Sequence, residues 1–300
     1  MGGGNIYHFS YYGYLRPDIL IGALLIHIDM QTIIIAYSVL MMTLSVLCCY
    51  IFLRQHTKDE NICIFVSLLV LLSSIFFHSH KQIMFVNLAL ISIEKKNFVA
   101  FTLCGSLIVL HSYFYCIGCF IVCFIYLLYR HPGEWKKLFV SYILIVLLTT
   151  ILTIPTLLVI LGNGKSGAST QLASLFIPSL NLKGLLYSEY GCGLTYISYI
   201  LLVLALSDKQ LQKLSAVCLV SFYSPFVWFI MNGFLYARSK IMLVFIPLVA
   251  YIMCMMLVKI KEGNIKLSKY SLVLLIIPVF FIKYPLSALI DCLFVIFLLL

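Results

Sequence analysis

Residues 31–53 read QTIIIAYSVLMMTLSVLCCYIFL, and residues 54–60 read RQHTKDE. The first run carries no charge and is long enough, at about 1.5 Å per residue, to cross the roughly 30 Å apolar core of a bilayer as a helix. The charged residues that follow are expensive to place in hydrocarbon, so they mark a membrane surface. This pattern predicts a transmembrane helix with a charged loop after it, and it recurs along the chain.

The composition agrees with that pattern over the whole length. Hydrophobic residues make up 63% of the chain and charged residues 10%, with a mean hydropathy of +1.12. Soluble domains are about a quarter charged, so we predict an all-α polytopic membrane protein in contact with lipid. The net charge of +10 lies in short loops, which excludes a nucleic-acid partner. The eleven cysteines lie mostly in apolar runs and are expected to pack as small apolar residues.

Further apolar runs divide the chain into about eleven expected spans. After 31–53 they are 62–77, 83–93, 98–129, 138–161, 194–206, 214–232, 241–258, 270–282 and 286–300. The run 98–129 is too long for one helix and is expected to split at 111–115, and Pro155 predicts a kink in 138–161. Residues 1–30 are expected to form an outer segment with a short amphipathic helix at 19–28. Residues 31–300 form the multi-span domain, with a long non-helical outer loop at 162–193.

The basic residues favour one orientation of these spans. Of the 20 lysines and arginines, thirteen fall in the alternate loops that follow 31–53 and its equivalents, and seven fall on the other side. Cytoplasmic loops carry the excess of basic residues. We therefore expect residues 1–30 and the loop 162–193 on the outer face of a bacterial cytoplasmic membrane. Because no helix or signal precedes that outer segment, we also expect a fragment of a longer chain.

Five blocks resemble a known family in the same order. They are GGGNIYHFSYYGYLRPDILIGALL (2–25), FFHSHKQIMFVN (76–87), HSYFYCIGCFIVCFIYLLYR (111–130), LLYSEYGCGLT (185–195) and NGFLYARSKIMLVFIPL (232–248). Together they resemble the bacterial YfhO-type membrane proteins of the GT-C glycosyltransferase class. The resemblance implies a GT-C-like helical bundle that transfers a sugar from a polyprenyl-phosphate carrier to a cell-surface glycopolymer such as lipoteichoic acid. Family members are longer and carry an acidic loop that would precede Met1.

Glycosyl transfer from a lipid phosphate needs a carboxylate as base and groups that stabilise the departing phosphate. The candidate catalytic carboxylates on the outer face are Asp18 and Glu189. Asp18 also fits the ordinary role of an acid in the first turn of a helix, and Glu189 that of a solvated loop residue. No cofactor is expected and no residue is assigned as a metal ligand, while metal dependence stays open.

The candidate groups for the phosphate and sugar gather on the same expected face. The phosphate-binding candidates are Arg16, His78, His80, Lys81, Asn87, Asn232 and Arg238, and the aromatic sugar contacts are Tyr7, Tyr11 and Tyr12. Each has an ordinary alternative. The basic residues also suit interface anchors, the asparagines and His111 suit hydrogen bonds between helices, and the tyrosines suit an interfacial aromatic belt.

Other function classes stay open beside the glycosyltransferase. A polysaccharide transporter or flippase would place polar residues at mid-span and show an internal repeat. A lipid-linked oligosaccharide polymerase would place paired arginines in large outer loops, whereas Arg16 and Arg238 are far apart in the chain. A truncated fragment without activity is the remaining alternative.

Overall fold

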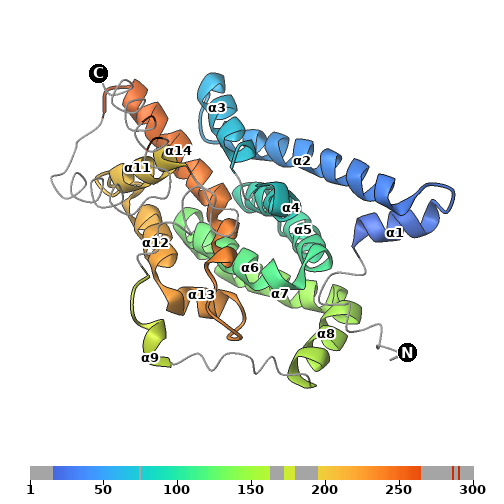
Figure 1. Cartoon of the computed structure of the whole chain (residues 1–300). Coiled ribbons are helices and arrows are strands. Elements are labelled where there is room, and N and C mark those ends of the chain that lie inside the picture. The colour runs from blue at the N-terminus through green and yellow to red at the C-terminus, as the bar shows by residue number, and fades with distance from the viewer. Residues whose placement is uncertain are drawn as a thin grey trace.

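The structure of the protein is a computed structural model that describes residues 16–73, 76–162, 172–179 and 195–264, together with Leu286 and Ile290. In that part of the chain every regular element is a helix and none is a strand (Figure 1). The prediction of an all-α protein is confirmed there.

Three helical segments of the described part are long and apolar enough to cross a membrane. They are α2 (Met30–Arg54), α6 (Tyr113–Arg130) and the segment Ser239–Lys261, which joins η3 (Ser239–Phe245) to α14 (Ile246–Lys261). Two bent helix pairs raise the number to five if each pair is one span. This supports a multi-pass membrane protein. About eleven spans are not reached within the described residues, and the expected spans 270–282 and 286–300 lie almost wholly outside them.

Shorter apolar helices fill the space between the spans. They are α3 (Glu60–Leu71), the apolar part Ile83–Glu94 of α4 (Phe76–Glu94), α5 (Phe98–His111) and α11 (Tyr196–Ala205). Polar loop residues cap several helix starts, because a side-chain oxygen there accepts a bond from an otherwise unpaired N–H group. Asp29 accepts from the Thr32 amide of α2 at 3.1 Å, and Asn97 accepts from the Ala100 amide of α5 at 3.0 Å. The predicted span 31–53 thus begins and ends within one residue of α2.

The long run 98–129 breaks where the sequence predicts. Helix α5 ends at His111, Ser112 is extended with φ −163° and ψ 108°, and α6 begins at Tyr113. On one side of this break the Tyr37 hydroxyl of α2 lies 2.8 Å from the Nε2 atom of His111, and on the other side Phe114 stacks on Tyr236.

Two other runs bend where the sequence analysis does not expect it. The run 138–161 was expected to kink at Pro155, but Pro155 lies inside α8 (Thr150–Gly162). The 77° bend lies between α7 (Trp135–Leu148) and α8. At the joint Thr149 donates its hydroxyl to the Ile145 carbonyl at 2.8 Å, a side-chain bond that competes with helix continuation.

The run 214–232 is likewise two helices, α12 (Gln212–Tyr223) and α13 (Pro225–Met231), bent by 92°. Pro225 keeps the preceding residue out of the helical region, and Ser224 has φ −100° and ψ 106°. The single span expected at 214–232 is therefore broken, and Pro225 starts the second helix in the position that proline favours.

Two local expectations near the outer segments also change. Helix α1 (Pro17–Leu24) ends four residues before the expected position 28, since the chain turns there into Asp29, the cap of α2. Its exposed side chains include Leu20 and Leu24, whereas Asp18 and Gly22 are buried. The apolar side of α1 therefore faces away from the rest of the bundle. Inside the loop 162–193, which was expected to be non-helical, residues Leu172–Leu175 form the short helix α9.

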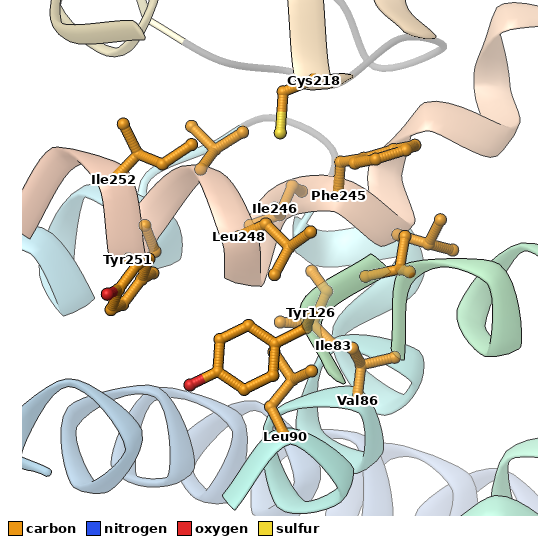
Figure 2. Close-up of a cluster of buried hydrophobic side chains, with 14 of the residues drawn as sticks. Ile83, Val86, Leu90, Tyr126, Cys218, Phe245, Ile246, Leu248, Tyr251 and Ile252 are labelled. Atoms are coloured by element: carbon orange, nitrogen blue, oxygen red, sulfur yellow. The ribbon is translucent and has the colours of Figure 1, made fainter. Parts of the chain in front are cut away.

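The segment formed by η3 and α14 lies at the centre of the described bundle. Within its most apolar window 89% of the residues are buried, against 28% for α2. Figure 2 shows Ile83 and Leu90 of α4 and Tyr126 of α6 close to Leu248 of this segment. A Cβ atom on Gly118 of α6 would lie 3.1 Å from the Ile241 side chain. In a bilayer such close packing replaces the hydrophobic effect as the force between helices.

One end of the bundle carries a connected layer of charges, which we call the basic layer. It comprises the ends of α2, α4, α6 and α14, the start of α7, and the loop between α11 and α12. Its ion pairs are Arg54–Glu60 at 2.9 Å, Arg130–Glu94 at 2.5 Å, Lys137–Glu134 at 2.9 Å, Lys259–Asp208 at 2.5 Å and Lys261–Asp59 at 2.5 Å. Loops that were assigned to one membrane face on charge alone therefore meet in space.

Candidate functional site

A group of polar and aromatic side chains lies around the break between α5 and α6, remote from the basic layer. We call this group the polar rim, and it comprises Arg16, Asp18, Tyr37, His111, Phe114, Asn232, Tyr236 and Arg238. It contains four of the predicted site residues, which are Arg16, Asp18, Asn232 and Arg238, and also His111, for which a bond between helices was expected. The rim has two arms, one on each side of the break.

The first arm begins with an ion pair on α1. Asp18 follows Pro17 in the first turn of the helix, which is the ordinary position predicted for it. Its side chain is 0% exposed and that of Arg16 is 27% exposed. The Arg16 guanidinium holds both carboxylate oxygens, from Nε to Oδ1 at 3.0 Å and from Nη2 to Oδ2. This two-bond geometry is the strong form of an arginine–carboxylate pair, and the guanidinium still reaches the surface.

Beside this pair a tyrosine and a histidine tie α2 to α5. The His111 Nδ1 atom lies 2.9 Å from the Leu107 carbonyl oxygen, so it carries the ring proton. The other nitrogen, Nε2, then accepts a hydrogen bond of 2.8 Å from the Tyr37 hydroxyl. The Phe85 ring lies 4.7 Å from the imidazole, and Asp18 acts electrostatically on Tyr37. His111 therefore makes a hydrogen bond between helices, which is the ordinary role predicted for it.

The second arm is the loop between α13 and η3. The Asn232 amide donates to the Trp228 carbonyl at 2.7 Å and to the Arg238 carbonyl at 3.2 Å. These bonds close a turn in which Gly233 and Phe234 have positive φ angles of 67° and 61°. The Asn232 Oδ1 atom is buried and has no partner within the described part of the chain.

Arg238 leaves this loop toward the surface. Its guanidinium lies 5.4 Å from the centre of the Tyr236 ring, a cation–π distance. Tyr236 in turn stacks on Phe114 of α6, with ring centres 5.9 Å apart. Phe114 follows the break that His111 precedes, so the two arms share the α5–α6 break as their support.

Asn87 is the predicted site residue that the structure separates from the rim. It is 0% exposed, and neither atom of its amide has a hydrogen-bond partner among the described residues. Helical spacing puts it on the face of α4 that carries Ile83 and Leu90, which faces the junction of η3 and α14 (Figure 2). Phe85, which reaches His111, lies on the opposite face. Asn87 is thus an interior residue of the bundle.

The remaining predicted site residues cannot be placed in either group. Tyr7, Tyr11, Tyr12 and Glu189 lie outside the described residues, and so do the side chains of His78, His80 and Lys81 in the first turns of α4. Their roles stay predictions. Within the described ranges no three histidine, cysteine or carboxylate side chains are grouped to hold a metal.

A hydrogen-bonded network in the basic layer was not predicted from the sequence. Tyr126 of α6 donates to the Glu94 carboxylate at 2.8 Å, and Arg130, one turn further on, donates to it at 2.5 Å and 3.2 Å. The His56 Nε2 atom lies 3.1 Å from the Tyr126 hydroxyl. Burial lowers the pKa of His56 from 6.5 to about 4, although Glu94 acts in the opposite direction. The spacing of Tyr126 and Arg130, four residues apart on an apolar helix, was the available signal.

Comparison with known proteins gives no relative for this chain: no family model, no curated protein and no solved structure matches it.

Proposed function

We propose that this chain is the membrane part of a GT-C-type glycosyltransferase, which moves a sugar from a polyprenyl-phosphate carrier to a cell-surface glycopolymer. The resemblance of its five blocks to the YfhO-type proteins supports the proposal. The observation that carries it is the buried Arg16–Asp18 pair in the polar rim, beside Tyr37 and His111. The bias of basic residues toward the opposite end supports an outer position for the rim.

The chemistry of the pair suits this reaction. An acceptor hydroxyl attacks the anomeric carbon of the donor, the bond from that carbon to the phosphate oxygen breaks, and the phosphate leaves with the electron pair. A carboxylate takes the hydroxyl proton. A lipid phosphate would compete with Asp18 for the Arg16 guanidinium, since arginine binds phosphate and carboxylate in the same geometry. Asp18 would then be released as the base, and Arg238 would be a second cation for the phosphate.

The proposal is tested with the full chain in proteoliposomes that contain a radiolabelled polyprenyl-phosphate sugar and a lipoteichoic acid acceptor. We expect transfer of the label to the polymer and its loss, by at least about a hundredfold, in Asp18→Asn and Arg16→Gln, because general base and phosphate stabilisation each contribute at that scale. The matched control is Asp29→Asn, an exposed cap of α2, which should retain the activity. Full activity of Asp18→Asn, or no transfer by the unchanged chain, would contradict the proposal.

A transporter or flippase is the second candidate, and one observation favours it. Asn87 has an unpartnered buried amide next to η3, a 3-10 segment of seven residues in the most enclosed span. Irregular backbone and buried polar groups near mid-membrane mark solute sites in transporters. If the chain moved a fluorescent lipid-linked sugar across liposomes without transferring it, and Asn87→Leu abolished that movement, this function would replace the glycosyltransferase.

A further inference from the structure

A groove lies between α5 and α7 on the surface of the bundle, away from both the polar rim and Asn87. Its volume is about 480 Å³. The side chains that line it are almost entirely apolar and include Val99, Leu103, Val140, Leu144 and Leu148. Val99 is 75% exposed and Leu148 is 61% exposed. In a membrane protein this α5–α7 groove opens toward lipid.

One end of the groove lies in the basic layer and offers a free cation. Lys136 and Lys137 line this end. Lys137 is bound to Glu134 at 2.9 Å, and Lys96 lies 3.9 Å from the same carboxylate, so Glu134 is already neutralised. No carboxylate of the described residues lies within 4.0 Å of Lys136. Its ammonium lies 5.8 Å from the ring centre of Trp135, and tryptophan favours the headgroup level of a bilayer.

Two further features, the start of α7 and the length of the groove, favour a lipid with a negative headgroup. Helix α7 starts here, and its first amides receive no bond from a capping side chain. A helix N-terminus of this kind attracts anions. The helix rises by about 18 Å from Lys136 to Leu148 along α7, comparable with one leaflet of about 15 Å. The groove thus has the length for an acyl chain and the charge for a phosphate.

We propose that the α5–α7 groove binds one anionic phospholipid of the leaflet at the basic layer, with an acyl chain along Val99, Leu103 and Leu144 and the phosphate at Lys136. Charge complementarity selects this occupant over a neutral lipid, because a basic residue near an anionic headgroup contributes about 1 kcal/mol. The proposal is independent of the proposed glycosyltransferase activity.

A second groove in the same protein provides the contrast. It lies between α2 and α3, has a volume of about 560 Å³ and is lined by Val46, Leu68 and other apolar side chains. The cation nearest in sequence to its basic end, Arg54, is bound to Glu60 at 2.9 Å. An acyl chain can enter this groove, but none of its lining residues is a lysine or an arginine, whereas Lys136 and Lys137 line the α5–α7 groove.

The test measures lipids that stay bound to the detergent-purified full chain by native mass spectrometry, after equal amounts of phosphatidylglycerol and phosphatidylcholine are added. We expect retention of phosphatidylglycerol and a preference about fivefold lower in Lys136→Gln, the factor that corresponds to about 1 kcal/mol. Leu144→Trp should fill the groove and remove the preference for phosphatidylglycerol. The matched controls are Lys213→Gln, an exposed lysine at the same end, and Leu68→Trp in the α2–α3 groove.

The outcomes separate the alternatives. Unchanged preference in Lys136→Gln, or an equal loss in Lys213→Gln, would overturn the site. Displacement of phosphatidylglycerol by an equimolar amount of undecaprenyl phosphate would overturn the phospholipid as the occupant. Both lysine variants change exposed side chains, so their circular dichroism spectra should match that of the unchanged chain.

Discussion

The basic layer and the polar rim contain similar residue types but use them differently. In the basic layer the carboxylates of Asp59, Glu60, Glu94, Glu134 and Asp208 are each held by a lysine or an arginine. In the rim, one carboxylate is held by Arg16, whereas Arg238 is exposed and the Asn232 oxygen has no partner in the described part. Charged groups that are paired hold helices together, whereas charged or polar groups without a partner remain able to bind a ligand. The ion pairs of the basic layer therefore have a structural role, and the proposed function places its chemistry in the rim.

The largest expected effect tests the structural role of the basic layer. Glu94→Gln should lower the free energy of unfolding by about 3 kcal/mol, because it leaves the partly buried Arg130 without its charged partner. The control Glu60→Gln, whose side chain is 64% exposed, should change it by less than about 0.5 kcal/mol. Unfolding in detergent, followed by tryptophan fluorescence, measures both. Equal losses would show that Glu94 is an ordinary surface charge.

The next effect separates stability from chemistry in the rim. Asp18→Asn alone should cost about 2 kcal/mol, since it leaves Arg16 facing a buried neutral group. The double variant Arg16→Gln with Asp18→Asn should recover most of that stability and still lack activity. A double-mutant cycle of unfolding free energies, run beside the transfer assay, checks this. A double variant that regains activity would assign the pair a purely structural role.

A smaller effect is expected from pH. The pKa of His56 is about 4 in the folded chain, below its ordinary value of 6.5. The unfolded chain therefore binds a proton first as the pH falls, and stability is lost between about pH 6.5 and pH 4, by roughly 1 kcal/mol because the side chain is only partly buried. His56→Phe should reduce this slope, whereas His27→Gln, at an exposed position, should not. The same slope in both variants would contradict the assignment.

The smallest effect concerns the bond between α2 and α5. Tyr37→Phe removes the hydroxyl that donates a hydrogen bond to His111. It should lower the free energy of unfolding by about 0.6 kcal/mol, the average for a hydrogen bond between membrane helices. If the rim is a site, the same variant should lower transfer by more than this loss explains, because Tyr37 lies next to Asp18. Equal unfolding midpoints and equal rates for Tyr37→Phe and the unchanged chain would remove Tyr37 from the site.

Features set by neighbouring residues were predicted well. The span 31–53, the break at 111–115 and the role of Asp18 in the first turn of α1 all agree with the structure. The bends at Thr149 and Ser224 were missed, although Pro225 is a local signal for the second. The proline at position 155 was given more weight than the threonines before it.

The residues of the candidate site also divide into those that were predicted from the sequence and those that were not. Arg16, Asp18 and Arg238 were expected together because the alternation of spans and loops places them on one face, and Asn232 was added by block resemblance. The rim contains all four. Asn87 was grouped with them by block resemblance, yet it faces the interior because it lies opposite Phe85 on α4. Tyr37 was not predicted, since a tyrosine inside an apolar run carries no sign of its partner His111, which is 74 residues away.

The sequence by itself determined that this is a helical membrane protein, where its longest spans lie and which loops carry the positive charge. Hydrophobicity, span length and loop charge act locally and can be counted along the chain. Only the tertiary structure decided which charges are compensated, as for Lys261 and Asp59, which are 202 residues apart, and which polar groups stay without a partner. Compensation depends on contacts between distant helices, and their packing is specified by close approaches such as Gly118 against Ile241 that no local pattern reveals.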